Sequence, residues 1–230
     1  MHWPFLTDVL RQLLSGLPLT LQLAAASLSI GFVLAVLVAA AAGCRIAPLR
    51  WMAGSYVELF RGTPLLVQIF FIYYGLGQIG VIRHSFFWPL LREPYWCAVL
   101  ALALNTSAYT AEIIRGAIEA VPAGEIEAGK ACGMSGLRLR RRIVWPIALR
   151  QGLPVYASEA ILMIKATSLA SIITLTELTG IAHNLIASTY RVMEVFIVTG
   201  SIYLALTFCL TAAFSVMERR LQAHHAHRRT

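Results

Sequence analysis

Four long stretches of the chain contain no charged residue, and their lengths give the first indication of the fold. They cover residues 12–44, 62–82, 94–111 and 195–217. The hydrocarbon core of a bilayer is about 30 Å thick and takes roughly 20 residues of helix at about 1.5 Å per residue. Each stretch meets or approaches that length, so we expect a transmembrane helix in each. We place the first helix at about residues 19–43 and expect the second to begin near Ser55.

A fifth stretch, residues 153–176, is apolar except for Glu159 and Lys165. These two residues are too far apart to be neighbours on a helix surface, so they point to different faces. The other side chains are mostly small or aliphatic, and we therefore count this stretch as a span. The pattern predicts an all-α, polytopic membrane protein with five transmembrane helices.

The composition agrees with a membrane protein. Hydrophobic residues make up 58% of the 230 residues and charged residues 13%, whereas a soluble domain carries about 25% charged residues. Lipid must solvate much of this apolar surface, so we expect residues 1–230 to form a single transmembrane domain. The four cysteines fit neither a zinc site nor a disulfide framework.

Lysine and arginine are divided unequally between the two predicted sides of the membrane. Residues 43–54, the loop 116–151 with Arg115 at its edge, and the C-terminal tail together hold thirteen, against four on the opposite side. Positively charged loops stay in the cytoplasm. We therefore predict an N-terminus outside, a C-terminus in the cytoplasm and a cytoplasmic loop at 116–151. The net charge of +8 then needs no nucleic-acid partner.

The loop 116–151 has a helical pattern of its own. Pro122 suits a helix start, Glu125 and Glu127 lie near the positive end of the helix dipole, and Gly133 suits a helix end. We expect a helix of two to three turns, a glycine-containing turn, and a second, basic helix that ends before Pro146. A helix this short is marginal in water, so it needs a membrane face or a partner protein to pack on.

The same loop resembles the EAA motif of permeases from ATP-binding-cassette (ABC) importers. The matching residues are Glu127, Ala128, Gly133, Ile143 and Pro146. Two positions depart from the motif, because Gly129 stands in place of its second alanine and Trp145 in place of leucine. The resemblance implies a coupling helix that fits a cleft on the ATPase and transmits its closure to the spans.

The resemblance covers about residues 54–203, most of the chain. Residues 58–68, 104–118 and 158–171 look like segments of permeases for polar amino acids, above all the M-type chains of histidine, lysine-arginine-ornithine and opine importers. This implies a type I importer fold in the bacterial inner membrane. It also implies assembly with a related Q-type permease chain, two ATPase subunits and a periplasmic solute-binding protein.

The predicted function is therefore that of a transport subunit for polar, cationic amino acids or opines, and not that of an enzyme. The sequence contains no Gly-x-x-x-x-Gly-Lys-Ser/Thr loop, so ATP and Mg²⁺ would be bound by the partner ATPase and this chain needs no cofactor of its own.

Ionisable and polar residues within the spans are candidates for the substrate path. Glu159 and Lys165 could face the polar groups of an amino acid, or could instead cap carbonyl groups or pair with another span. Asn105 and Gln68 could line the path or make hydrogen bonds between helices. Glu58 and Arg61, one turn apart, are expected to form a gate or a packing pair rather than a binding site.

Two other functions fit the sequence less well. An ion-driven secondary amino-acid transporter is the alternative, but such folds usually contain internal repeats, and none is visible here. An intramembrane enzyme would need paired catalytic groups inside the spans, and no predicted span contains a histidine. The histidines and arginines at 219–229 indicate a basic tail near anionic lipid rather than a metal site. No catalytic or metal-binding residue is expected.

Overall fold

The computed structural model describes the backbone of residues 3–226 and the side chains of residues 4–220, and all its regular elements are helices. The side chains of the histidine-rich tail at 224–229 lie outside this part. Two π-helical turns (Phe71–Gly75 and Arg140–Val144) and two 3-10 segments (Leu76–Gln78 and Thr167–Ile173) interrupt the α-helices. In chain order the α-helices are α1 (Trp3–Ala42), α2 (Ala47–Gly62), α3 (Leu65–Phe70), α4 (Gly80–Arg83), α5 (Trp88–Leu91), α6 (Pro94–Glu119), α7 (Ala123–Ala131), α8 (Gly136–Leu139), α9 (Trp145–Ala166), α10 (Leu178–Thr189) and α11 (Val192–Ala226).

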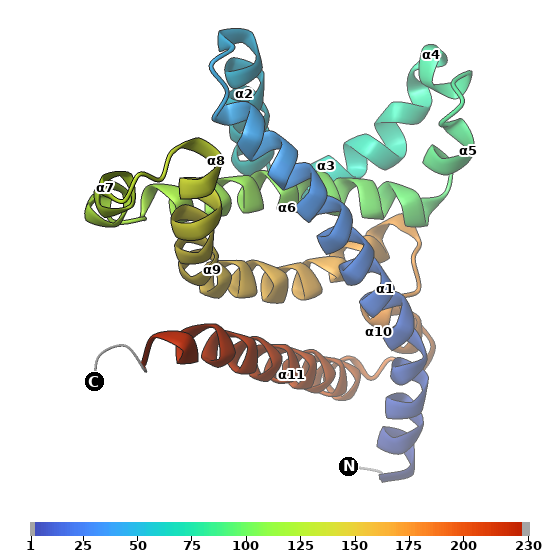
Figure 1. Ribbon diagram of the computed structural model, residues 1–230. Coiled ribbons are helices and arrows are strands. Elements are labelled where there is room, and N and C mark those ends of the chain that lie inside the picture. The colour runs from blue at the N-terminus through green and yellow to red at the C-terminus, as the bar shows by residue number, and fades with distance from the viewer. Residues whose placement is uncertain (1–2, 227–230) are drawn as a thin grey trace.

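Four helical segments of the described chain are long and apolar enough to cross a membrane, and a bent pair can form a fifth span. The four are α1, α6, the continuous segment Gly136–Ile173 and α11, and the bent pair is α2 with Leu65–Gln78. Their number and order agree with the sequence prediction. Figure 1 shows α6, α9 and α11 running in similar directions, with α1 crossing them.

The first helix is longer than predicted, since α1 begins at Trp3 rather than near Leu19. Val9 and Leu13 of this extension are buried against α10 and the start of α11. Asp8 and Arg11 lie on the exposed face. The extension is therefore an amphipathic helix, and because it contains charged residues it is not part of a charge-free stretch.

The second span is broken rather than straight, which corrects the sequence prediction. The axes of α2 and the segment Leu65–Gln78 differ in direction by 106°. The break falls at Thr63 and Pro64, both of which have extended backbone. Proline disfavours helical geometry in the residue before it and has no N–H group for the helix.

The basic segment after the predicted turn does not end before Pro146, as the sequence suggested. It continues through the π-helical turn Arg140–Val144 directly into α9. Pro146 occupies the first turn of α9, and the wider π turn next to it accommodates the missing N–H. The basic residues at 138–142 and the fourth span therefore belong to one continuous helical segment.

The centre of the molecule is formed where α1 crosses α6. At Gly31 a side-chain methyl group would overlap Thr106 and would lie 3.1 Å from the Ala103 carbonyl oxygen. Small residues at such crossings let helices approach closely without a hydrophobic drive. Around this point Leu23, Ile69, Val99 and Ile173 form a buried cluster that ties α1, α3 and α6 to the 3-10 segment.

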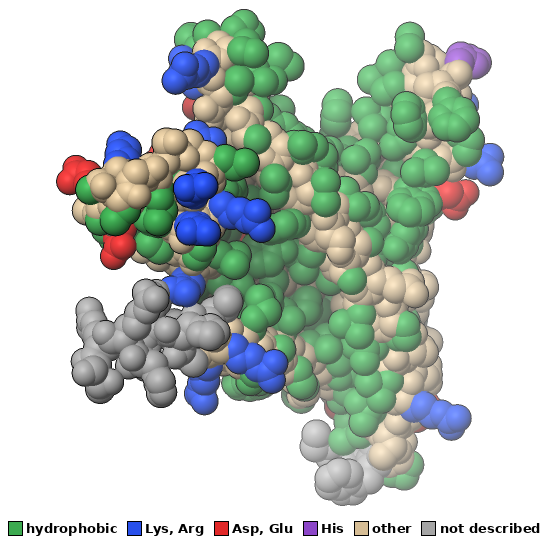
Figure 2. Space-filling view, in the orientation of Figure 1, with side chains coloured by type: hydrophobic (Ala, Val, Ile, Leu, Met, Phe, Trp, Pro, Cys, Tyr) green, Lys and Arg blue, Asp and Glu red, His purple; other side chains and the backbone are tan. Residues whose placement is uncertain are grey.

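Charged side chains gather on one side of the molecule. α7 and the C-terminal end of α11 lie on the left in Figure 1, whereas α4 and α5 lie on the right. Lysine and arginine side chains cluster on the left side in Figure 2. This arrangement is what a cytoplasmic loop 116–151 and a cytoplasmic C-terminus require, and the orientation stays a prediction.

Candidate functional site

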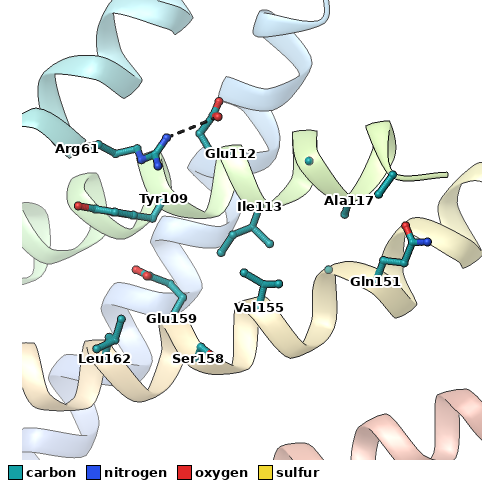
Figure 3. Close-up of a pocket in the computed structure, with 13 residues that line it drawn as sticks. Arg61, Tyr109, Glu112, Ile113, Ala117, Gln151, Val155, Ser158, Glu159 and Leu162 are labelled. Atoms are coloured by element: carbon teal, nitrogen blue, oxygen red, sulfur yellow. Dashed lines mark ion pairs between the residues drawn. The ribbon is translucent and has the colours of Figure 1, made fainter.

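A cavity of about 590 Å³ lies between α2, α6 and α9 (Figure 3). Arg61 reaches it from α2, Glu112 from α6 and Glu159 from α9. Between these charged groups the walls are largely apolar, with Ile113 and Val155 facing each other. The break after α2 matters here, because it ends that helix beside α6 and so places Arg61 at the cavity.

Arg61 does not pair with Glu58, contrary to the sequence prediction. Its Nη1 atom lies 3.6 Å from Glu112 Oε2, and its guanidinium carbon lies 5.3 Å from the centre of the Tyr109 ring. Glu112 is shared, because Arg115 Nη2 lies 2.7 Å from the same oxygen. Arg115 also binds Glu119 at 2.7 Å. Two helices thus contribute to a chain of alternating charges at the edge of the cavity.

Glu159 lies half-buried in the cavity wall and has no ion-pair partner among the described side chains. Thr106 of α6 donates a hydrogen bond of 2.9 Å to its Oε1 atom. A carboxylate can accept several hydrogen bonds, so Oε2 keeps capacity for a cationic donor. The arrangement leaves a carboxyl group with free acceptor capacity in a largely apolar wall.

The other three predicted path residues do not line this cavity. Lys165 is exposed on another face of α9. Gln68 and Asn105 are buried together, with Asn105 Nδ2 donating to Gln68 Oε1 at 3.1 Å. Gln68 Nε2 in turn donates to the carbonyl oxygens of Phe60 and Thr63 at 2.9 and 3.1 Å. The two amides therefore satisfy carbonyl groups that the break in the second span leaves without helical partners.

A buried carboxylate that the sequence analysis did not single out lies beside the first helix. Glu177 is fully buried at the N-cap of α10, where Oε1 accepts the Gly180 N–H at 2.9 Å. Its Oε2 accepts hydrogen bonds from Tyr203 at 3.0 Å and Thr20 at 3.4 Å. Burial raises the pKa of the Glu177 carboxyl, and these donors oppose that rise. The N-cap position before an apolar helix was the available signal.

The predicted short helix of the loop exists as α7, and Gly133 ends it as expected. Gly133 has a left-handed backbone (φ +75°). Its N–H donates to the Lys130 carbonyl at 2.9 Å, and the Met134 N–H donates to the Gly129 carbonyl at 3.0 Å. This pair of bonds is the Schellman motif. It turns the chain back toward α8.

The two departures from the EAA motif have different surroundings. Gly129 is buried, and a methyl group there would lie 2.5 Å from Ile143 Cδ1 and 2.6 Å from Leu139 Cδ1. These larger side chains therefore fill the space above the missing methyl. Trp145 is half-exposed. Of the motif residues, Glu127, Ala128 and Gly133 are exposed, and Ile143 and Pro146 are half-buried.

No group of three or more histidine, cysteine, aspartate or glutamate side chains in the described part could hold a metal ion. The site as described consists of a half-buried carboxylate at Glu159 in the cavity wall and an exposed short helix, α7.

Comparison with known proteins shows which family of proteins shares these features. Residues 31–223 match the family model described as "Binding-protein-dependent transport system inner membrane component". The octopine transport system permease protein OccM of Rhizobium radiobacter is 56% identical over 217 residues, which cover 93% of this chain and 87% of that protein. The arginine ABC transporter permease protein ArtM of Haemophilus influenzae is 36% identical over 216 residues, covering 94% and 95%.

A solved structure described as an amino acid ABC transporter with histidines has a closely similar fold. It superimposes with a TM-score of 0.86 at 34% sequence identity and covers 96% of this chain and 99% of that one.

Proposed function

Since the chain belongs to the family of binding-protein-dependent transport system inner membrane components, we propose that it carries polar, cationic amino acids or opines across the bacterial inner membrane as a permease subunit of an ABC importer. The observation that supports this most directly is Glu159. It is an ionisable group that has no ion-pair partner among the described side chains and lies in a cavity between three helices, and ionisable groups within membrane-spanning helices mark transport pathways.

The cargo is proposed from shared chemistry. Octopine and arginine, which the names of two relatives mention, both contain a guanidinium group. A carboxylate recognises that planar cation through paired hydrogen bonds. Glu159 is proposed as its receptor, with Arg61 placed to attract a substrate carboxylate at the far side of the same cavity. Gln68 and Asn105 support the path indirectly by holding the broken span, and Lys165 has no assigned contact.

The loop is proposed to couple transport to ATP hydrolysis. Glu127, Ala128, Gly133, Ile143 and Pro146 form or support the surface that an ATPase subunit would grip. ATP and Mg²⁺ belong to that partner. The exposed α7 and its fixed glycine turn favour a rigid docking element over a mobile loop. The complete assembly is proposed to contain a Q-type permease chain, two ATPase subunits and a periplasmic solute-binding protein.

Uptake into proteoliposomes tests the proposal. The chain is reconstituted with its ATPase, second permease and binding protein, and entry of labelled arginine and octopine is measured with and without ATP on the ATPase side. Uptake that needs ATP supports the importer, whereas uptake by the chain alone on an ion gradient would support the secondary transporter.

The receptor is tested by Glu159→Gln, with Ser158→Ala as a control on the same cavity wall. Glu159→Gln should lower uptake about tenfold or more, the effect of losing roughly 1.4 kcal/mol of binding. Ser158→Ala should transport normally. Equal uptake by both variants would remove Glu159 from the substrate path.

A further inference from the structure

A second hollow of about 380 Å³ adjoins the candidate cavity and shares Ile113, Ala117 and Gly152 with it as a common wall. Side chains from α1, α6, α9 and α11 line it, and none of them is charged. Its rim is half-exposed at Phe32, Trp145, Leu149 and Met217. It is therefore an apolar groove open to the surroundings, which we call the α1–α11 groove.

The α1–α11 groove has the depth of one membrane leaflet. Its lining on α9 extends from Trp145 to Tyr156, which corresponds to about 16 Å of helix. Half of a hydrocarbon core measures about 15 Å. At the inner end the Tyr156 ring packs edge-on against Phe32, with ring centres 5.6 Å apart, and against Phe214 at 6.4 Å. A transmembrane helix of a partner would need a groove through both leaflets, whereas an acyl chain needs one.

Positive charge surrounds the other end of the groove. Arg140, Arg141 and Arg142 lie within about one turn before Trp145, and Arg220 lies one turn after Met217. All four are exposed, and none forms an ion pair with a described side chain. No acidic residue occurs between positions 128 and 158. Lysine and arginine side chains gather at the left of Figure 2, on the side where Figure 1 shows α8 and the end of α11.

We infer that the α1–α11 groove binds one acyl chain of an anionic phospholipid from the cytoplasmic leaflet, with the headgroup phosphate held by Arg141 and Arg142. Van der Waals packing against the apolar lining favours the chain, and basic residues at the membrane surface attract anionic headgroups at about 1 kcal/mol each. Trp145 would stand at the boundary between chain and headgroup, where the amphipathic indole ring is favoured. The bound lipid would touch the helix that continues into the docking loop.

The binding of the acyl chain is tested with the intact complex purified in mild detergent. Phosphatidylglycerol that remains bound after washing is measured by mass spectrometry. Val36→Trp fills the groove from α1, and Val33→Trp adds the same side chain at an exposed position outside it. Val36→Trp should lower retained phosphatidylglycerol about tenfold, and Val33→Trp should leave it unchanged. Equal retention in the two variants would overturn the inference.

The headgroup part of the inference is tested by comparing how much phosphatidylglycerol and how much phosphatidylcholine the purified complex retains. Arg141→Gln with Arg142→Gln should abolish the preference for phosphatidylglycerol, while Arg138→Gln, on the preceding α8, should keep it. A photo-crosslinker placed at position 36 decides the identity of the occupant. A crosslink to phospholipid supports the inference, and a crosslink to another subunit overturns it. None of these readouts depends on the transported substrate.

Discussion

The side-chain amide of Asn105 in α6 donates a hydrogen bond of 3.1 Å to the side-chain oxygen of Gln68 in α3. Both side chains also donate to the Phe60 carbonyl oxygen at the end of α2. A span that bends by 106° within a membrane leaves backbone groups that lipid cannot satisfy. These two amides replace the missing helical donors.

Replacing Gln68 should therefore destabilise the bent span. Gln68→Leu removes the donors to Phe60 and Thr63, and each unsatisfied buried carbonyl costs about 1–3 kcal/mol. The melting temperature of the purified complex should fall by about 2–4 °C for each kcal/mol lost. Gln78→Leu is the matched control, because Gln78 is exposed on the same segment. Equal melting temperatures for the two variants would show that the amide does not hold the break.

The crossing of α1 and α6 should not tolerate even one added methyl group at Gly31. Gly31→Ala places Cβ against Thr106 and the Ala103 carbonyl, and overpacking of this kind costs about 1–3 kcal/mol. Gly54→Ala in α2 meets no atom within 4 Å, and alanine stabilises a helix interior by up to about 1 kcal/mol over glycine. Thermal unfolding should shift in opposite directions for the two variants, and a shift in the same direction would contradict this packing.

The turn at Gly133 predicts which substitution separates docking from folding. Gly133→Asn and Gly133→Asp have similar size, and both side chains tolerate a left-handed backbone. No atom lies within 4 Å of the position where Cβ would be added. Both variants should therefore insert, but the charge in Gly133→Asp should reduce substrate uptake and ATPase co-purification much more strongly. Normal uptake by Gly133→Asp would count against the assignment of α7 as the coupling helix.

Glu177 should contribute to stability rather than to transport selectivity. Glu177→Ala removes the cap of α10 and the carboxylate acceptor of the Tyr203 hydroxyl, at a cost of about 2 kcal/mol. Glu58 is an exposed glutamate, so Glu58→Ala should change stability by less than about 0.5 kcal/mol. The comparison uses denaturation of the purified complex together with uptake ratios for arginine and octopine. A changed ratio in Glu177→Ala would contradict the structural role.

Charge-free length located four of the spans, because lipid favours that pattern in a helix that crosses it, and the fifth was recognised from its mostly apolar side chains despite Glu159 and Lys165. It could not find the start of α1 or the whole of α10, since both pack on protein and follow amphipathic rather than uniform patterning. The break at Pro64 carried a local signal, but whether proline kinks, ends or redirects a helix depends on the surrounding donors. Asn105, which supplies one of them, is 45 residues away from its acceptor Phe60, and the nearby Gln68 reaches Phe60 and Thr63 only once the chain has bent.

The loop was easier to predict than the cavity. Gly133 predicts a helix end because only glycine adopts the left-handed backbone readily, and this preference depends on the residue itself rather than on distant contacts. Glu159 was identified because charge in a span is rare, yet its partner Thr106 comes from another helix. The mistaken pairing of Glu58 with Arg61 has the same origin. Spacing along one helix favoured that pair, but the bend carries Arg61 toward Glu112, which no local pattern shows.

The continuous helical segment Gly136–Ile173 has a mechanical consequence. It carries the basic π-helical turn near one end and Glu159 along α9, and Figure 1 shows that it bends where α8 and the π turn pass into α9. α9 alone contains 22 residues and is about 33 Å long, so rotating it by about 10° around its middle would move each end by about 3 Å. A small push on the residues next to α7 would thus tilt the whole wall of the cavity at once. The π turn and Pro154 are the points where the segment is least stiff, and there any bending would concentrate.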